Sequence, residues 1–247
     1  RGVAHCQSLE GFRKAYEDAV TKAEEDGKKV KFLYMIPDFQ NPSGESLSLE
    51  ERQILADLAM KHGFLIVEDS PYRELRYEGE HIPTIYSLAP DHVIHLGSFS
   101  KIFAPGFRLG WAIAHPDILD KIYVCKQSLD LCPPILDQYV AAEFLSSGRL
   151  DLNLKNTIDL YKGKRDLLLS LLEEHMPEGV SWTHPEGGLF LFPSRHPPHS
   201  AESLKGADMP LPPSQTCPAQ GRCLLSAART AGCLSDERSC YSMIFII

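Results

Sequence analysis

The chain has 247 residues, of which 43% are hydrophobic and 23% are charged, as is usual for a globular protein with a buried core. Its formal net charge of −8 argues against nucleic acid or an anionic membrane as a main partner, because both bind positively charged surfaces. No apolar run approaches the roughly 20 residues that a membrane-spanning helix needs. We therefore expect a cytoplasmic protein with neither kind of partner.

The seven cysteines include no CxxC pair, so neither a zinc site nor a disulfide framework is indicated. No other metal-ligand spacing is present, and we expect no metal. Cys125 and Cys132 lie in segments with a helical pattern, and we predict that both are buried core thiols.

The predicted elements alternate between strands and helices. Residues 9–26 carry apolar side chains at helical spacing, which predicts an amphipathic helix. A second helix begins after Ser48, which can form a capping box with Glu51, and ends at Gly63. Four short apolar runs predict buried strands, over residues 31–36, 64–67, 93–96 and 109–114. This alternation predicts an α/β fold with a mostly parallel sheet packed between helices.

Further along, apolar periodicity predicts three helices and two strands. The helices are expected over residues 116–129, 134–145 and 150–175, and the strands over residues 180–183 and 189–192. A turn, Pro185 to Gly188, separates the two strands. His184 flanks this turn, and we predict a structural rather than a ligand role for it.

Polar side chains follow three of the predicted strands. Asn41, Asp69 and Lys101 each come shortly after an apolar run. The carboxyl ends of parallel strands meet at one edge of a sheet, where ligands bind in open α/β folds. Each residue alone is an ordinary turn or surface residue. Three of them at equivalent strand ends predict a binding site.

The loop after the third strand combines hydroxyls with cations. Ser98, Ser100 and Arg108 suit a phosphate, because arginine presents a planar fork of donors that matches phosphate oxygens. Lys101, in a partly desolvated loop, can attack a carbonyl to form a Schiff base. A phosphate and an aldehyde on one small molecule suggest pyridoxal 5'-phosphate.

The other two strand ends complement this chemistry. Asp69 beside a pyridine nitrogen would stabilise the protonated ring, which then acts as an electron sink. Asn41 and Tyr72 can donate hydrogen bonds to the ring oxygen. Lys101, once displaced by a substrate, could move a proton.

Three motifs resemble those of the class I and II aminotransferases of fold type I, which depend on pyridoxal phosphate: NPSG at 41–44, VEDSPY at 67–72 and SFSKIFAPGFRLGW at 98–111. The resemblance assigns Lys101 to covalent attachment of the cofactor and Asp69 to the pyridine nitrogen. It assigns Asn41 and Tyr72 to the ring oxygen. It assigns Ser98 and Arg108 to the phosphate, with Ser100 as an additional candidate. Lys101, Asp69 and Tyr72 are thus the expected catalytic residues.

The wider pattern, YxIPxFQNPSG and EDSPYRELRYEGE, is similar to the subgroup acting on 2-aminoadipate, kynurenine and related amino acids. The resemblance covers roughly residues 8–192. It implies an incomplete large cofactor-binding domain over residues 1–149 and the start of a small α+β domain over residues 150–192. A full relative would be a homodimer that moves an amino group from an L-amino acid to a 2-oxo acid.

Beyond residue 192 the resemblance ends. Residues 193–222 are rich in proline and show no apolar periodicity, which predicts an irregular, divergent tail over residues 193–247. The family binds the substrate carboxylate with an arginine, but Arg222, Arg229 and Arg238 lie in no strand-like pattern. We therefore expect a truncated or aberrant chain that does not catalyse amino transfer by itself.

Two alternatives stay open. Some transcription regulators carry an aminotransferase-like ligand-sensing domain with the same motifs, and a basic helix-turn-helix segment ahead of it would identify them. A non-catalytic splice product would keep the motifs but lack the groups that bind substrate.

Overall fold

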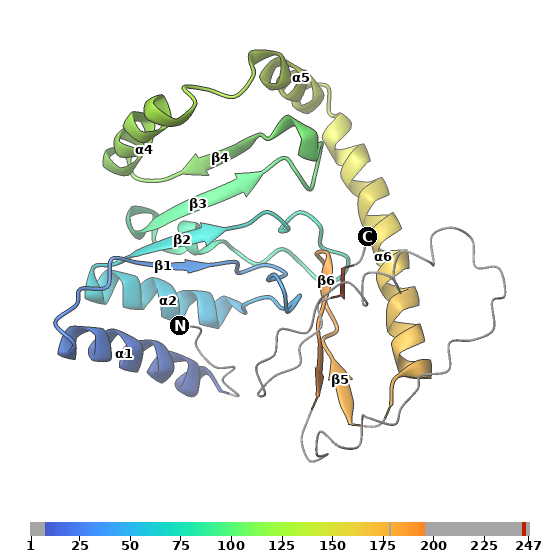
Figure 1. Ribbon diagram of the computed structural model, residues 1–247, viewed down its shortest axis with the longest axis horizontal. Helices are drawn as coiled ribbons and strands as arrows, with labels where there is room; N and C mark the ends of the chain where they lie inside the picture. The colour runs from blue at the N-terminus through green and yellow to red at the C-terminus, as the bar shows by residue number, and fades with distance from the viewer. Residues whose placement is uncertain (1–7, 178, 196–243, 246–247) are drawn as a thin grey trace.

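The computed structural model describes residues 8–177, 179–195 and 244–245 (Figure 1). Its helices are α1 (Leu9–Glu25), α2 (Leu49–His62), α3 (Ile85–Leu88), α4 (Pro116–Leu129), α5 (Ile135–Ser146) and α6 (Arg149–His175), with 3-10 turns at Pro90–His92 and Pro105–Phe107. Its strands are β1 (Phe32–Met35), β2 (Leu65–Asp69), β3 (Val93–Ser98), β4 (Gly110–Ile113), β5 (Val180–Trp182), β6 (Phe190–Leu191), β7 (Pro193–Arg195) and β8 (Ile244–Phe245). The predicted alternation of helices and strands is confirmed. The short helix α3 and the strands β7 and β8 were not expected, because residues 193–247 were predicted to be irregular.

The main sheet has the strand order β1-β2-β3-β4. The first three strands are parallel, with Tyr34 paired to Val67 and Asp69 paired to Leu96, while β4 runs antiparallel to β3. The prediction of a mostly parallel sheet is therefore confirmed. Because β1, β2 and β3 point the same way, the loops that follow them leave the sheet at one edge.

One face of the sheet is covered by α1, α2 and α3. The predicted capping box is present: Ser48 N donates to Glu51 at 2.8 Å, and Glu51 N donates to Ser48 Oγ at 3.2 Å. Gly63 ends α2 with a left-handed backbone, φ +67°. The apolar side of α2 packs between α1 and the sheet in one core cluster, which includes Phe12, Leu55, Leu58, Ile66 and Val93.

The opposite face of the sheet is less covered than the predicted packing between helices implies. Side chains that alternate onto that face from β2 and β3, such as Leu65 and Ile94, are only partly buried, and Phe32 and Tyr34 of β1 are exposed. Within the described residues, α4 buries no side chain, and large apolar residues such as Leu129 and Tyr139 are exposed.

The prediction that Cys125 and Cys132 are core thiols is wrong, because both are exposed. Cys125 lies on α4, and Cys132 lies in the connection to α5. A helical pattern of apolar residues indicates which side of a helix can be buried. It does not show that another element of the described structure covers that side.

The C-terminal part begins with α6, which runs from α5 to a set of short strands (Figure 1). There β5 pairs with β7, and β6 pairs with β8, both antiparallel. The turn at residues 185–188 docks on the segment after Tyr72: Tyr77 N donates to the Glu186 carbonyl at 2.7 Å, and Gly188 N donates to the Leu75 carbonyl at 2.8 Å. His184, next to this turn, is exposed.

Regular pairing extends three residues past the predicted start of the tail, because β7 covers Pro193–Arg195. The rest of the predicted tail lies outside the described residues, apart from β8, and so do Arg222, Arg229 and Arg238. Over the part of the chain that the structure describes, no helix is both long enough and apolar enough to cross a lipid bilayer.

The core cluster leads to a stability prediction. Leu55 is fully buried on α2, whereas Met60 on the same helix is 48% exposed. We expect Leu55→Ala to lower the free energy of unfolding by about 2–5 kcal/mol, because it removes buried methyl groups and leaves a cavity. Met60→Ala, the control, should change it by no more than about 0.5 kcal/mol. Chemical denaturation measures both; equal losses in the two variants would show that this cluster is not the core.

Candidate active site

The predicted site residues come together at the carboxyl edge of the sheet. Asp69 is the last residue of β2, the loop carrying Asn41 follows β1, and the loop carrying Lys101 follows β3. The three strands are adjacent and parallel, in the order β1-β2-β3. The structure thus delivers an amide, a carboxylate and an amine to one edge from three neighbouring strands.

Asp69 is partly buried and is held by a residue that the sequence analysis did not single out. The hydroxyl of Tyr34, on β1, donates to Asp69 Oδ2 at 2.6 Å. Burial and this hydrogen bond raise the pKa of Tyr34 to about 12, because both favour the neutral phenol. Tyr34 lies within the YxIPxFQNPSG pattern, but only the strand register shows that it reaches the next strand.

Tyr72 is a buried phenol next to Asn41. Burial raises the pKa of Tyr72, and the negative charge of Asp69 raises it further, while a hydrogen bond with Asn41 acts in the opposite direction. The Tyr72 ring meets the Phe190 ring edge-on, with centroids 5.1 Å apart. Phe39 completes this small cluster. The hydroxyl of Tyr72 is therefore held beside Asn41 and within the field of Asp69.

Ser98, Ser100 and Arg108 form a small polar group in the loop after β3. Ser100 N donates to Ser98 Oγ at 3.1 Å, and Arg108 Nη1 lies 3.5 Å from Ser100 Oγ. Arg108 has a left-handed backbone, φ +54°, and its guanidinium also donates to the Pro105 carbonyl at 3.2 Å. Hydroxyls, a backbone amide and a guanidinium in one loop suit an anion.

Lys101 lies at the tip of the same loop, and its side chain is exposed. This differs from the expected partly desolvated lysine, because no described element covers the solvent side of the loop. On its other side the loop is supported: Phe103 stacks on Phe144 of α5 with ring centroids 4.3 Å apart. Asn153 of α6 donates to the Ile102 carbonyl at 2.9 Å. Neither support was foreseen from the sequence.

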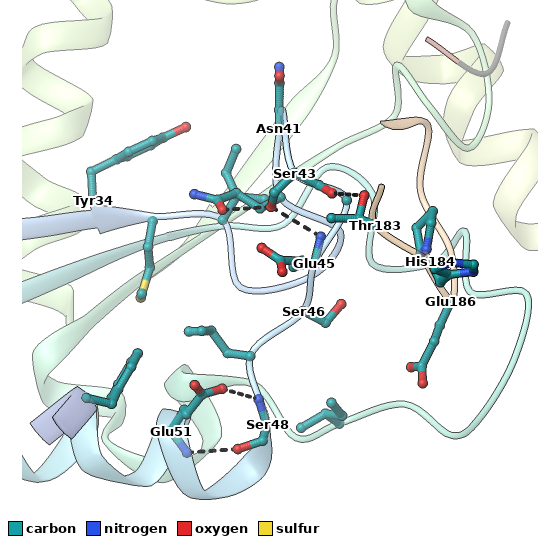
Figure 2. Close-up of a pocket in the computed structure, with 18 of the residues that line it drawn as sticks. Tyr34, Asn41, Ser43, Glu45, Ser46, Ser48, Glu51, Thr183, His184 and Glu186 are labelled. Carbon is teal, nitrogen blue, oxygen red and sulfur yellow. Dashed lines mark hydrogen bonds between the residues drawn. The ribbon is translucent and has the colours of Figure 1, made fainter. Parts of the chain in front are cut away.

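A cleft of about 910 Å³ lies next to this edge, between α1, the loop after β1 and residues 183–186 (Figure 2). Thr183 donates to the Ser43 carbonyl at 2.7 Å across it. The cleft includes Tyr34 and Asn41 but not Asp69, Tyr72 or Lys101. It therefore borders the predicted site without containing its reactive groups.

The described residues contain no cluster of three or more histidine, cysteine or acidic side chains that could hold a metal ion. The groups at the sheet edge instead fit pyridoxal 5'-phosphate. Asp69 offers a carboxylate for a pyridinium, Asn41 and Tyr72 offer donors for a phenolate, and the loop after β3 offers both an amine and an anion site.

Comparisons with known proteins agree with this chemistry. Residues 5–209 match the family described as "Aminotransferase class I and II". The chain is 46% identical over 177 residues to the aromatic-amino-acid aminotransferase 1 of Thermococcus litoralis, covering 71% of this chain and 42% of that protein. It is also 32% identical over 165 residues to the HTH-type transcriptional regulator NorG of Staphylococcus aureus, covering 66% of this chain and 37% of that one.

Among solved structures, the chain resembles the kynurenine aminotransferase of Pyrococcus horikoshii, solved in complex with PMP and KYN as substrates and KYA as products. The TM-score is 0.71 and the identity is 43%, over 73% of this chain and 45% of that one. The chain thus spans less than half the length of these relatives. Its fold is that of the fold type I enzymes, whose cofactor is pyridoxal phosphate, and the chain belongs to the family of class I and II aminotransferases.

Proposed function

We propose that this chain is part of a pyridoxal-phosphate-dependent transaminase, which moves an amino group from an L-amino acid to a 2-oxo acid. The observation that carries this proposal is the arrangement of the strand ends. The loop after β1 carries Asn41, the end of β2 carries Asp69 with Tyr72 just beyond it, and the loop after β3 carries Lys101. These three strands are adjacent and parallel, so the residues lie at one edge of the sheet. An amine, a carboxylate, ring-oxygen donors and an anion site so placed suit one pyridoxal phosphate molecule.

Each side chain has a separate role in this proposal. Lys101 would hold the cofactor through its amine, and the same amine, when free, would move the proton at the substrate Cα. The Asp69 carboxylate keeps the pyridine nitrogen protonated. When bound, the cofactor ring supplies an electron sink for the electron pair released at Cα. Asn41 and Tyr72 donate to the ring oxygen, and Ser98, Ser100 and Arg108 bind the phosphate.

The proposed amino donors are aminoadipate-, kynurenine-, aromatic- or branched-type amino acids. The sequence pattern at residues 34–44 and 68–80 supports this choice. So does the similarity to proteins named for aromatic amino acids and for kynurenine.

We further propose that the complete protein is a cytoplasmic homodimer without a nucleic-acid or membrane partner. The net charge of −8 supports the absence of both partners. The large apolar side chains exposed on α4 and α5 are the kind that subunit interfaces cover. The proposed division is a partial large domain over residues 1–149, the start of a small domain over residues 150–192, and a divergent tail over residues 193–247.

A ligand-sensing role within a transcription regulator is the second candidate, supported by the similarity to NorG. A regulator needs the cofactor-binding groups but not turnover. The reaction of a fuller chain with amino donors therefore separates the two functions. The splice-product alternative also predicts binding without turnover, so the transcript is needed to tell it from a regulator.

Lys101 should be the residue that bonds to the cofactor. We expect the chain mixed with pyridoxal phosphate to show a visible absorption band, and borohydride reduction to fix the label on the peptide containing Lys101. Lys101→Ala should abolish the band and leave the far-ultraviolet circular dichroism unchanged, because Lys101 is exposed. Lys121→Ala on α4 is the control and should keep the band. A label on Lys121 or Lys126 would contradict the assignment.

Asp69→Asn should separate binding from chemistry. The variant can still accept the hydrogen bond from Tyr34 but loses the charge that holds the pyridinium. In an intact relative with the same change, we expect cofactor affinity to fall modestly and turnover to collapse. Steady-state kinetics measure the second effect. Unchanged turnover would rule out the electron-sink role.

Arg108→Ala should mainly weaken cofactor binding. Losing a hydrogen bond from a charged group costs about 1.5–3 kcal/mol, which corresponds to roughly a 10- to 150-fold rise in Kd. Titration with pyridoxal phosphate measures this change, and Arg149→Ala at the start of α6 serves as the control. Wild-type affinity in Arg108→Ala would remove Arg108 from the phosphate site.

We propose that residues 1–247 alone do not catalyse transamination. Arg73 and Arg76, the arginines nearest Tyr72 in sequence, are engaged with Asp38, with the Ile82 carbonyl and with Glu186. Neither is available to orient a substrate carboxylate, and a displacement of about 1 Å can cost roughly a hundredfold in rate. The assay uses 2-aminoadipate, kynurenine and leucine as donors and 2-oxoglutarate as acceptor. Turnover comparable to that of an intact relative would contradict this proposal.

A further inference from the structure

Asp38, three residues before Asn41, is the centre of a buried charge cluster. Its carboxylate is 1% exposed. Arg52 of α2 approaches it with two nitrogens, Nη2 at 2.7 Å from Oδ1 and Nη1 at 3.3 Å from Oδ2. Arg73 Nη1 lies 3.4 Å from Oδ2, and Arg76 Nη2 lies 3.8 Å from Oδ1. One carboxylate thus meets three guanidinium groups from two elements.

Arg52 is itself fully buried and well satisfied. Besides Asp38, its guanidinium donates to the carbonyl oxygens of Leu47, Pro83 and Pro37, each at 3.1 Å. Removing charges from water is costly, and well-packed apolar residues often stabilise a core equally well. The buried Asp38–Arg52 pair is therefore better explained by the loop geometry that it imposes than by a gain in the stability of the fold.

The cluster holds the loop that carries Asn41. The next residue, Phe39, is fully buried with a left-handed backbone, φ +52°, which is unfavourable for a bulky side chain. Its amide donates to Ser46 Oγ at 3.0 Å, and its ring lies 4.7 Å from the Arg76 guanidinium. A side chain at Gly187 would overlap the Phe39 ring, and one at Gly188 would overlap the Phe39 Cβ, so this turn closes directly over Phe39.

The same cluster holds the loop that carries Tyr72. Arg73 directly follows Tyr72 in the chain and Arg76 comes three residues later, and both reach back to Asp38. Arg76 also pairs with Glu186 at 2.7 Å, and the Tyr72 ring packs with Phe39 and Phe190. The loops after β1 and β2 are thus joined at one carboxylate, and the C-terminal turn is joined to them.

We propose that Asp38 is a positioning residue, which sets Asn41 and Tyr72 relative to each other so that both donate to one ligand oxygen. This inference rests on the proposed function only for the identity of that oxygen. The coupling between the two loops is a property of the chain itself, so it is open to test without any cofactor.

The test is hydrogen–deuterium exchange of the whole chain, read by mass spectrometry, in Asp38→Asn, Asp38→Glu and the control Asp57→Asn. Asp57 also lies near an arginine, Arg13 at 3.6 Å, but both groups are 42% exposed. We expect Asp38→Asn to speed exchange by about tenfold or more both in residues 36–48 and in residues 70–78, with β2 and β3 unchanged. Asp38→Glu should partly restore protection, and Asp57→Asn should match the wild type.

Two outcomes would overturn the proposal. One is faster exchange only in residues 36–48. The other is a uniform rise in exchange rate throughout the sheet, which indicates that Asp38 has a merely structural role. If Asp38→Asn does not fold, Arg73→Gln removes one contact and leaves the Asp38–Arg52 pair. The same two-loop pattern, in weaker form, is then expected. Its absence would equally overturn the proposal.

A second readout uses the bound cofactor. Hydrogen bonds to the ring oxygen favour its anionic form, so weakening them should raise the pH midpoint of the absorption band. For Asp38→Asn we expect a rise of about one pH unit, a tenfold change in the proton equilibrium. A wild-type chain without any band would contradict the proposed function but leave the exchange result valid. A band with an unchanged midpoint would contradict the positioning role alone.

Discussion

The parallel pairing of β1, β2 and β3 is the constraint on which the rest of the structure depends. Asp69 pairs with Leu96 and Tyr34 pairs with Val67, so the three strands end in a row. Residues far apart in the sequence can therefore belong to one site when each of them follows the end of a strand. Asn41, Asp69 and Lys101 are separated by 28 and 32 residues, as their numbers show, yet they leave the sheet at one edge.

The buried contacts around Asp38 and Phe39 give this edge its fine geometry. Parallel strands place loops near one another, but loops are the most variable part of a fold. Here the loop after β1 is joined to the loop after β2 by arginines, and both are covered by the turn at residues 185–188. Arg165 of α6 adds to this contact by donating to the Pro185 carbonyl at 2.8 Å. The C-terminal segment is therefore part of the site's support.

Local chemistry made much of this predictable. The Ser48–Glu51 capping box, the left-handed Gly63 and the short apolar strands depend on neighbours in sequence, and the structure has all of them. Asn41, Asp69 and Lys101 could be grouped because each follows an apolar run. The Tyr34–Asp69 hydrogen bond and the Asp38 cluster could not be foreseen, because each joins residues 14 to 38 positions apart. The exposure of Cys125 likewise depends on which elements cover α4, which periodicity does not reveal.

The most direct test is a crystal structure of the chain with pyridoxal phosphate bound. Our prediction is that the cofactor carbon is bonded to Lys101 Nζ, that the pyridine nitrogen lies about 3 Å from an Asp69 oxygen, and that the phosphate contacts Arg108. A ring bound instead in the neighbouring cleft, against Phe12 and Tyr16, would contradict it. So would a pyridine nitrogen facing away from Asp69.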